Sequence, residues 1–164
     1  MSQKKPAAAA GRAAEALPLL RFLWQVNHGL QAASKRMAQH LGVTGPQRLV
    51  LKALSQSPGM TPGALSRELH LDPGTLTGVL GRLERDRHLR RAADPHDGRR
   101  SLLGLTESGR RIAGLKTGTI EARVDAALGR LGPDDSAAAE RVLQALAEAL
   151  LAPEPRIHAV PRGR

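Results

Sequence analysis

The sequence predicts a mainly α-helical fold that contains one short β-hairpin. Over most of the chain, apolar residues recur at intervals of three and four, the period of a helix with one buried face. Two short runs, 89–92 and 101–105, instead flank a segment that contains Asp94-Pro95 and Asp97-Gly98. Because Asp-Pro and Asp-Gly favour turns, we expect these two runs to be paired strands.

The composition favours duplex DNA as the partner. The chain has 164 residues and a formal net charge of +10, which favours nucleic acid over an anionic membrane. Its only aromatic residues are Phe22 and Trp24, and both lie far from the arginine-rich segment. Proteins that bind single strands or RNA usually stack bases on aromatic rings, so duplex DNA is the better match.

Several functional classes are excluded or unsupported. The absence of cysteine excludes disulfides, thiol catalysis and cysteine-ligated zinc. No apolar run approaches the ~20 residues of a membrane span, and residues 1–16 resemble a disordered basic tail rather than a signal peptide, which favours the cytoplasm. Six scattered histidines and no glycine-rich phosphate loop give no support for an enzyme, a metal site or a cofactor.

The central part of the chain predicts a helix-turn-helix. A first helix in 17–43 ends at Gly42, and a second opens at Thr44-Gly45-Pro46. Thr61-Pro62 and Asp72-Pro73 each combine an N-cap residue with proline at the first helical position, and start helices that reach about 69 and 87. With the hairpin behind them, residues 44–106 are predicted to form a winged helix-turn-helix.

The two ends of the chain are predicted to form a dimerisation lobe. Thr106 is expected to cap one long helix to about 131, and a second helix covers about 136–151 before a flexible tail, 152–164. Together with 17–43, these helices in 107–151 carry more apolar positions than the central segment can cover. They either pack only on their own chain or form a homodimer, which is usual for proteins that read paired half-sites.

The helix at 72–87 is the predicted reading element for the major groove. Leu76, Val79, Leu80 and Leu83 share one side and should face the core. The other side is small and hydroxylic, then basic, which suits close approach to base edges. An ordinary amphipathic surface helix is the alternative. The candidate contact residues of this helix are Gly74, Thr75, Thr77, Arg82 and Arg85.

The hairpin tip is the predicted element for the minor groove. Arg99 and Arg100 lie at the tip, and Asp97 is placed to hold a guanidinium by a paired hydrogen bond. We expect Asp97 to orient Arg99, which would enter a narrow minor groove, and Arg100 to contact phosphate.

These motifs resemble the MarR family of regulators. Asp97-Gly98-Arg99, followed after five residues by Leu105-Thr106, is similar to that family's wing signature, and residues 71–84 resemble its recognition helix. The resemblance implies that Thr75, Thr77 and Arg82 read the major groove and that the terminal helices form the dimer. The chain departs from the family pattern at Gly78, where arginine is frequent, and at Arg87, where glycine commonly ends the helix.

The resemblance also implies a small aromatic or phenolic anion as effector. Trp24 and His28, one helical turn apart, are candidates to line its pocket, and Arg91 to meet its carboxylate. Core packing for Trp24 and structural roles for the other two are the alternatives. The prediction is a homodimeric, sequence-specific repressor of transcription; the alternative is an architectural duplex-DNA-binding protein of low specificity.

Overall fold

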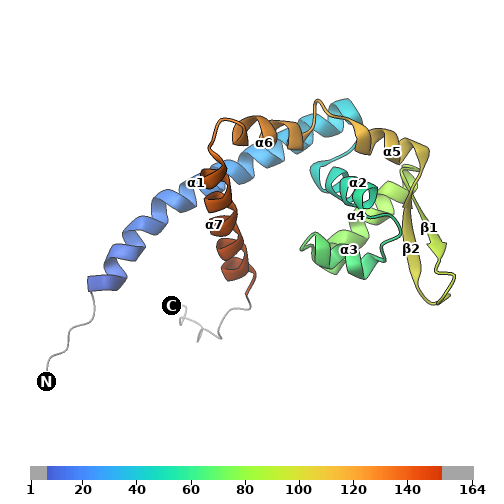
Figure 1. The fold of residues 1–164 in the computed structure, drawn as a ribbon, viewed down its shortest axis with the longest axis horizontal. Coiled ribbons are helices and arrows are strands. Elements are labelled where there is room, and N and C mark those ends of the chain that lie inside the picture. The colour runs from blue at the N-terminus through green and yellow to red at the C-terminus, as the bar shows by residue number, and fades with distance from the viewer. Residues whose placement is uncertain (1–6, 153–164) are drawn as a thin grey trace, which may run out of the picture. The chain divides into compact units, whose positions relative to one another are not determined.

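The computed structural model describes residues 7–152, with side chains from residue 16 onward. These residues form seven helices and one antiparallel hairpin, so the predicted mainly helical fold is confirmed (Figure 1). The chain divides after Ala122 into two compact units. None of the helices in the described range is both long and apolar enough to cross a bilayer.

The first unit contains the helix-turn-helix and the hairpin, and the second consists of the end of α6 and α7 (Figure 1). The elements are α1 (Ala7–Leu41), α2 (Gly45–Gln56), α3 (Pro62–Glu68), α4 (Pro73–Arg85), β1 (Leu89–Ala93), β2 (Ser101–Leu105), α5 (Glu107–Gly114), α6 (Ile120–Leu128) and α7 (Pro133–Leu151).

The core of the first unit lies between α2, α3, α4 and the hairpin. All four residues assigned to the core side of α4, from Leu76 to Leu83, are buried. They pack with Val50 and Leu54 of α2 and with leucines of both strands. Burial of a side chain of this size stabilises the fold by about 1.5–3 kcal/mol, so this cluster sets the orientation of α4.

The hairpin is held to the helices at its middle and at its base. Leu89 pairs with Leu105 and Ala93 with Ser101, which matches the predicted strands. At the edge of the sheet, Leu103 N–H donates to the Met60 carbonyl at 2.9 Å, which joins β2 to the loop before α3. Figure 1 shows the hairpin beside α4 and α5, with its tip extending beyond them.

Side-chain caps start the helices where the sequence places them. Thr61 accepts a hydrogen bond from Ala64 N–H at 3.2 Å, and Asp72 accepts one from Thr75 N–H at 3.0 Å. Thr106 accepts from Gly109 N–H at 3.1 Å. Each cap satisfies an amide that has no partner inside its helix.

The connection from α4 to β1 uses a left-handed backbone at Arg87, with φ of 57°. The structure ends α4 at Arg85 rather than at the predicted 87, and Arg87 takes the strained conformation for which glycine is usual. Thr106 Oγ1 donates to the Arg87 carbonyl at 2.7 Å, which holds this turn against the end of β2. Any side chain on Gly109 would clash with the neighbouring His88 carbonyl oxygen, so α5 starts directly against the same turn.

Two further predicted helix boundaries differ from the structure. The first helix begins at Ala7 instead of following a tail that ends at 16, since the alanine-rich segment has high helix propensity. Residues 1–6 and 153–164 of the predicted tails lie outside the described residues. Pro133 occupies the first turn of α7, which therefore begins before the predicted 136.

The predicted long helix from 106 to 131 is wrong, because it is interrupted between α5 and α6. Leu115 has an extended backbone, and Gly118 has φ of 72°. Thr119 then caps the next helix by accepting from Ala122 N–H at 3.2 Å. An extended residue and a left-handed glycine cannot continue an α-helix, so the chain changes direction here.

Arg48 of α2 stabilises this interruption from inside the core. The side chain is only 2% exposed, and its guanidinium donates to the Ile112 and Leu115 carbonyls at the end of α5. Its Nε lies 2.8 Å from Glu121 Oε1 in the first turn of α6. One cation therefore donates to two carbonyls at the end of α5, of which Ile112 also accepts from Leu115 N–H, and pairs with a carboxylate at the start of α6.

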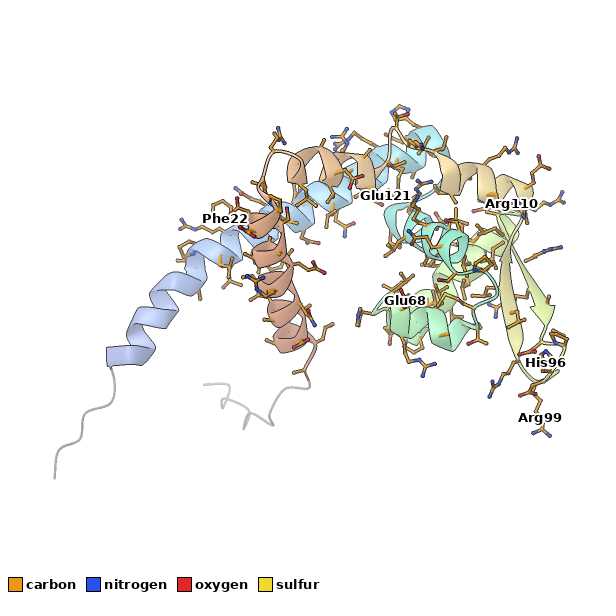
Figure 2. The ribbon with its side chains drawn as sticks, viewed as in Figure 1. Phe22, Glu68, His96, Arg99, Arg110 and Glu121 are labelled. Carbon is orange, nitrogen blue, oxygen red and sulfur yellow. The ribbon has the colours of Figure 1, made fainter. Side chains whose placement is uncertain are left out.

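Glu121 is the acidic partner in this arrangement and is labelled in Figure 2. Burial raises the pKa of its carboxyl, but a backbone hydrogen bond, the bond from Arg48 and attraction to Lys52 outweigh burial, so the pKa lies below the usual value. A pKa that is lower in the folded chain contributes stability at pH above the unfolded value, and this contribution is lost as the pH falls through the folded value.

We predict that Arg48→Met lowers the free energy of unfolding by about 2–3 kcal/mol at neutral pH, since it removes the donors to the Ile112 and Leu115 carbonyls and the cation that pairs with Glu121. Urea unfolding at a constant chain concentration measures this. Glu121→Gln should cost less, because its side chain is 36% exposed, and its deficit should shrink as the pH falls below about 4. Equal stability of Arg48→Met and the parent chain would contradict the role of Arg48.

Candidate DNA-binding surface

The outer face of α4 presents the residues that the sequence predicts. The packing of Leu76, Leu80 and Leu83 turns Thr75, Thr77 and Arg82 into solvent. Gly74 and Arg85 are exposed as well. The structure thus brings all five candidates onto one exposed helix, with small groups in the first half and guanidinium groups in the last turn.

The hydroxyl of Thr77 is already engaged within the helix. Its Oγ1 donates to the Pro73 carbonyl at 2.7 Å, and a hydroxyl has only one proton to donate. The groups that Thr77 can offer to another molecule are its methyl group and the lone pairs of its oxygen. It can therefore accept a hydrogen bond or contact an apolar group, but it cannot donate without breaking the bond to Pro73.

The glycines of α4 leave part of this face without side chains. A Cβ atom built on Gly78 or Gly81 would meet no atom within 4 Å. The folded chain therefore does not require glycine at either position, although each glycine costs about 1 kcal/mol relative to alanine inside a helix. Any molecule that docks on α4 can approach the helix backbone closely at these two positions.

The turn between the strands is organised by Asp94 and Asp97. Asp94 Oδ1 accepts from His96 N–H at 2.9 Å, and Asp97 Oδ1 accepts from Arg99 N–H at 3.1 Å. These are side-chain-to-backbone bonds two residues apart, which are typical of tight turns. They fix the backbone of the tip, from which the Arg99 side chain extends away from the hairpin in Figure 2.

The expected pairing of Asp97 with the Arg99 guanidinium is wrong. Asp97 Oδ2 instead lies 3.2 Å from Arg100 Nε, while Arg99 is held only through its backbone amide. The turn determines which arginine pairs with Asp97, because it directs the Arg100 side chain, three residues along, back over Asp97 and the Arg99 side chain outward. Both ends of the Asp97–Arg100 pair are largely exposed, so the pair contributes little stability.

Arg91 lies in a different place from the other two predicted ligand residues. Its Nε lies 2.5 Å from Glu84 Oε1, and it lines a cavity between α3 and α4 together with Thr77. Trp24 and His28 lie exposed on α1, and Trp24 has 70% of its surface in solvent. The structure of one chain therefore does not pack Trp24 into the core, and it does not join these three residues in one cavity.

A cavity of about 320 Å³ lies instead between α1, α2 and the start of α6. Its walls are mainly apolar, with Leu30 from α1 and Leu49 from α2, while Arg48 and Glu121 contribute the charged groups. None of Trp24, His28 and Arg91 is among the described residues that line it. This volume is within the usual range of small-molecule sites.

Sequence reasoning missed Arg48 and Glu121 altogether. The position of Arg48, one helical turn before buried Leu51, could have indicated a buried charge. An arginine on the core face of a helix requires buried partners. The partners themselves could not be identified, since Glu121 lies 73 residues away in the chain.

The chain is similar to known regulators both in its centre and over most of its length. A family model described as the MarR family matches residues 41–100. The transcriptional repressor Rv2887 of Mycobacterium tuberculosis is 30% identical over 133 residues, which cover 81% of this chain and 96% of that protein. The regulator TtmR of Methylorubrum extorquens is 39% identical over 87 residues, but the match covers 53% of this chain and only 45% of TtmR.

Solved structures of regulators are also similar to this chain over most of its length. The PcaV regulator of Streptomyces coelicolor, solved with its natural ligand, is 30% identical, covers 92% of this chain and 99% of its own, and has a TM-score of 0.65. A mutant of Escherichia coli MarR, solved with operator DNA, is 27% identical, covers 80% and 95% of the two chains, and has a TM-score of 0.66.

We predict opposite effects of alanine at Gly78 or Gly81 on stability and on DNA binding. Each substitution should raise the free energy of unfolding by about 0.5–1 kcal/mol, since its methyl group enters open space. Each should weaken duplex binding by roughly fivefold, or about 1 kcal/mol, by holding the helix away from the bases.

Chemical unfolding and fluorescence anisotropy with labelled duplex measure the two effects. Gly29→Ala on α1, where a Cβ atom also meets nothing within 4 Å, is the matched control and should change stability only. Unchanged DNA affinity in the α4 variants would show that their backbone does not approach DNA.

Proposed function

Because the chain belongs to the MarR family of transcriptional regulators, we propose that it binds specific duplex DNA sites and regulates transcription there. The observation that carries this proposal is the pairing of two exposed elements on one compact unit: α4, with its core side fully buried, and a hairpin tip that extends Arg99 into solvent (Figure 2). The similarity to a MarR structure solved with operator DNA supports it.

In this proposal, α4 enters the major groove and supplies most of the sequence discrimination. Gly74, Gly78 and Gly81 allow the backbone to approach the base edges. Thr77, whose proton is bonded to Pro73, suits a thymine methyl or an amino group of adenine or cytosine better than a guanine acceptor. Thr75 and Arg82 are the other base contacts, and Arg85 is positioned for guanine or phosphate at the end of α4.

The hairpin tip binds the adjacent minor groove. The turn bonds of Asp97 hold the backbone of Arg99, so its guanidinium can enter a narrow groove, where the potential is most negative. Arg100, paired with Asp97, contacts phosphate. A minor-groove arginine reads mainly groove shape, which makes the hairpin an aid to affinity and register.

The protein acts as a homodimer on a pseudo-palindromic site. Large apolar side chains remain exposed on α1, α6 and α7, including Trp24 and Leu150 at 70% each, and apolar faces of this kind favour association. A two-fold dimer presents two copies of α4 to paired half-sites. The other exposed apolar residues of these helices are Leu17, Leu19, Leu20, Phe22, Val26, Leu30, Val124, Leu128, Val142, Leu143 and Leu151.

A small aromatic or phenolic anion releases this repressor from DNA. The cavity between α1, α2 and the start of α6 supports this part of the proposal better than the predicted trio does, because its volume and apolar walls suit an aromatic ring; its two charged groups, Arg48 and Glu121, already pair with each other. The similarity to PcaV, which was solved with its natural ligand, also supports it. In a dimer, Trp24 and His28 could contact a ligand that is bound in the other chain. Arg91 could contact a ligand only in the separate cavity between α3 and α4.

A second candidate function is architectural duplex binding with little sequence preference. The bare glycine positions of α4 favour it, since they remove side chains that could read bases. Competition distinguishes the two functions: promoter DNA from the chain's own gene should displace a labelled site far better than random duplex does. Equal competition by random duplex would reject the regulator and leave the architectural protein.

We predict that Arg99→Ala weakens binding to the specific site by about tenfold or more and lowers the log–log salt slope by about 0.9, the effect of one lost phosphate-strength contact. Arg100→Ala should have a smaller effect, because its guanidinium already pairs with Asp97. Arg111→Ala on α5 removes the same charge from another exposed position and is the control. An Arg99→Ala protein of unchanged affinity would remove Arg99 from the mechanism.

We predict a mass in solution of twice the 17.4 kDa of the chain at micromolar concentration, measured by light scattering after gel filtration. Val26→Glu and Leu150→Glu should shift the mass toward that of one chain, because each places a charge in an exposed apolar face. Arg141→Glu, on a solvent-exposed position of α7, is the control and should remain dimeric. A single-chain mass for the parent protein would reject the dimer.

A further inference from the structure

A second cavity, of about 330 Å³, lies between the end of α2, the end of β2 and α5. Its floor consists of buried apolar side chains, Leu54, Leu105 and Ala113. A cavity of about 150 Å³ is sufficient for a benzene ring, so this volume accommodates a ring together with a polar substituent.

Two cationic side chains from different helices line this cavity. Lys52 comes from α2 and Arg110 from α5, and no carboxylate is among the described residues that line the space. The Arg110 guanidinium donates to the Leu105 carbonyl at 2.9 Å, which holds it at the end of β2. Ser55 donates its hydroxyl proton to the Lys52 carbonyl, so the two cations are the main donors for a ligand.

Lys52 is not neutralised inside the cavity. The carboxylate that it attracts, Glu121, is already bonded to Arg48. Lys52 is half-buried and lines the cavity, so its aliphatic chain covers apolar surface and its ammonium group can meet an anion at the rim. The site thus combines an apolar floor with two cations that, among the described lining residues, have no anion between them.

We propose that this cavity binds a small amphipathic carboxylate, with its apolar part on Leu54, Leu105 and Ala113 and its carboxylate between Lys52 and Arg110. The site is separate from the Arg48 cavity and from α4, and it does not depend on DNA binding. Because its two cations belong to α2 and α5, a bound carboxylate joins the same two helices that Arg48 joins, and it stabilises the first unit.

The test uses isotope-labelled full-length protein titrated with benzoate and observed by amide NMR. Saturable shifts are expected at residues 52–58 and 105–114. Benzyl alcohol, which keeps the ring and lacks the charge, should bind there at least about tenfold more weakly, the factor typical of losing a hydrogen bond to a charged group. Benzoate shifts confined to residues 27–49 and 120–121 would assign it to the Arg48 cavity and overturn the proposal.

Variants separate this site from general attraction to a basic protein. Lys52→Met and Arg110→Met should each raise the benzoate dissociation constant measured at residues 52–58 by about tenfold. Lys52→Arg should retain binding, and Arg111→Met, which removes the adjacent exposed charge outside the cavity, should leave the constant unchanged. An equal loss in Arg111→Met, or no loss in either cavity variant, would overturn the proposal. Failure of DNA binding would leave these outcomes unaffected.

Discussion

The buried guanidinium of Arg48 is the constraint on which the arrangement of the first unit depends. A cation that is almost fully excluded from water requires complete hydrogen bonding, and it finds this only where α5 ends and α6 begins. Satisfying Arg48 therefore determines where the predicted long helix is interrupted. The same group joins α2 to the end of α5 and the start of α6, and α2 in turn packs against α4.

The position of the hairpin relative to α4 is set by a second group of contacts at the base of the hairpin. Thr106 caps α5 and bonds to the strained turn at Arg87, Gly109 packs against His88, and Leu103 bonds to Met60. These contacts join the end of β2 to the turn before β1 and to the loop before α3. Because α4 and the hairpin are tied at these points, major-groove and minor-groove contacts can be made together without an ordering cost at the time of binding.

The successful predictions depend on local propensity and periodicity, whereas the failed ones depend on the direction of side chains or on residues that the fold brings together. The caps at Thr61 and Asp72, the strands and the core side of α4 were all predicted, because local propensity and period determine them. Asp97 was assigned to the wrong guanidinium, since Arg99 and Arg100 differ only in the direction that the turn gives their side chains. Trp24 and Arg91 were grouped because the family resemblance implies an aromatic anion, and the fold places them on separate surfaces.

By itself, the sequence determined the helix-turn-helix, the hairpin and the exposed residues that make this chain a MarR-family protein, because turn residues, caps and apolar periodicity act over a few neighbouring positions. Tertiary structure alone decided the break between α5 and α6, the burial of Arg48 and the two cavities that α2 helps to line. These features need partners as far as 73 residues apart, and the stability of a buried charge depends on where those partners come together in the fold, which no local pattern records.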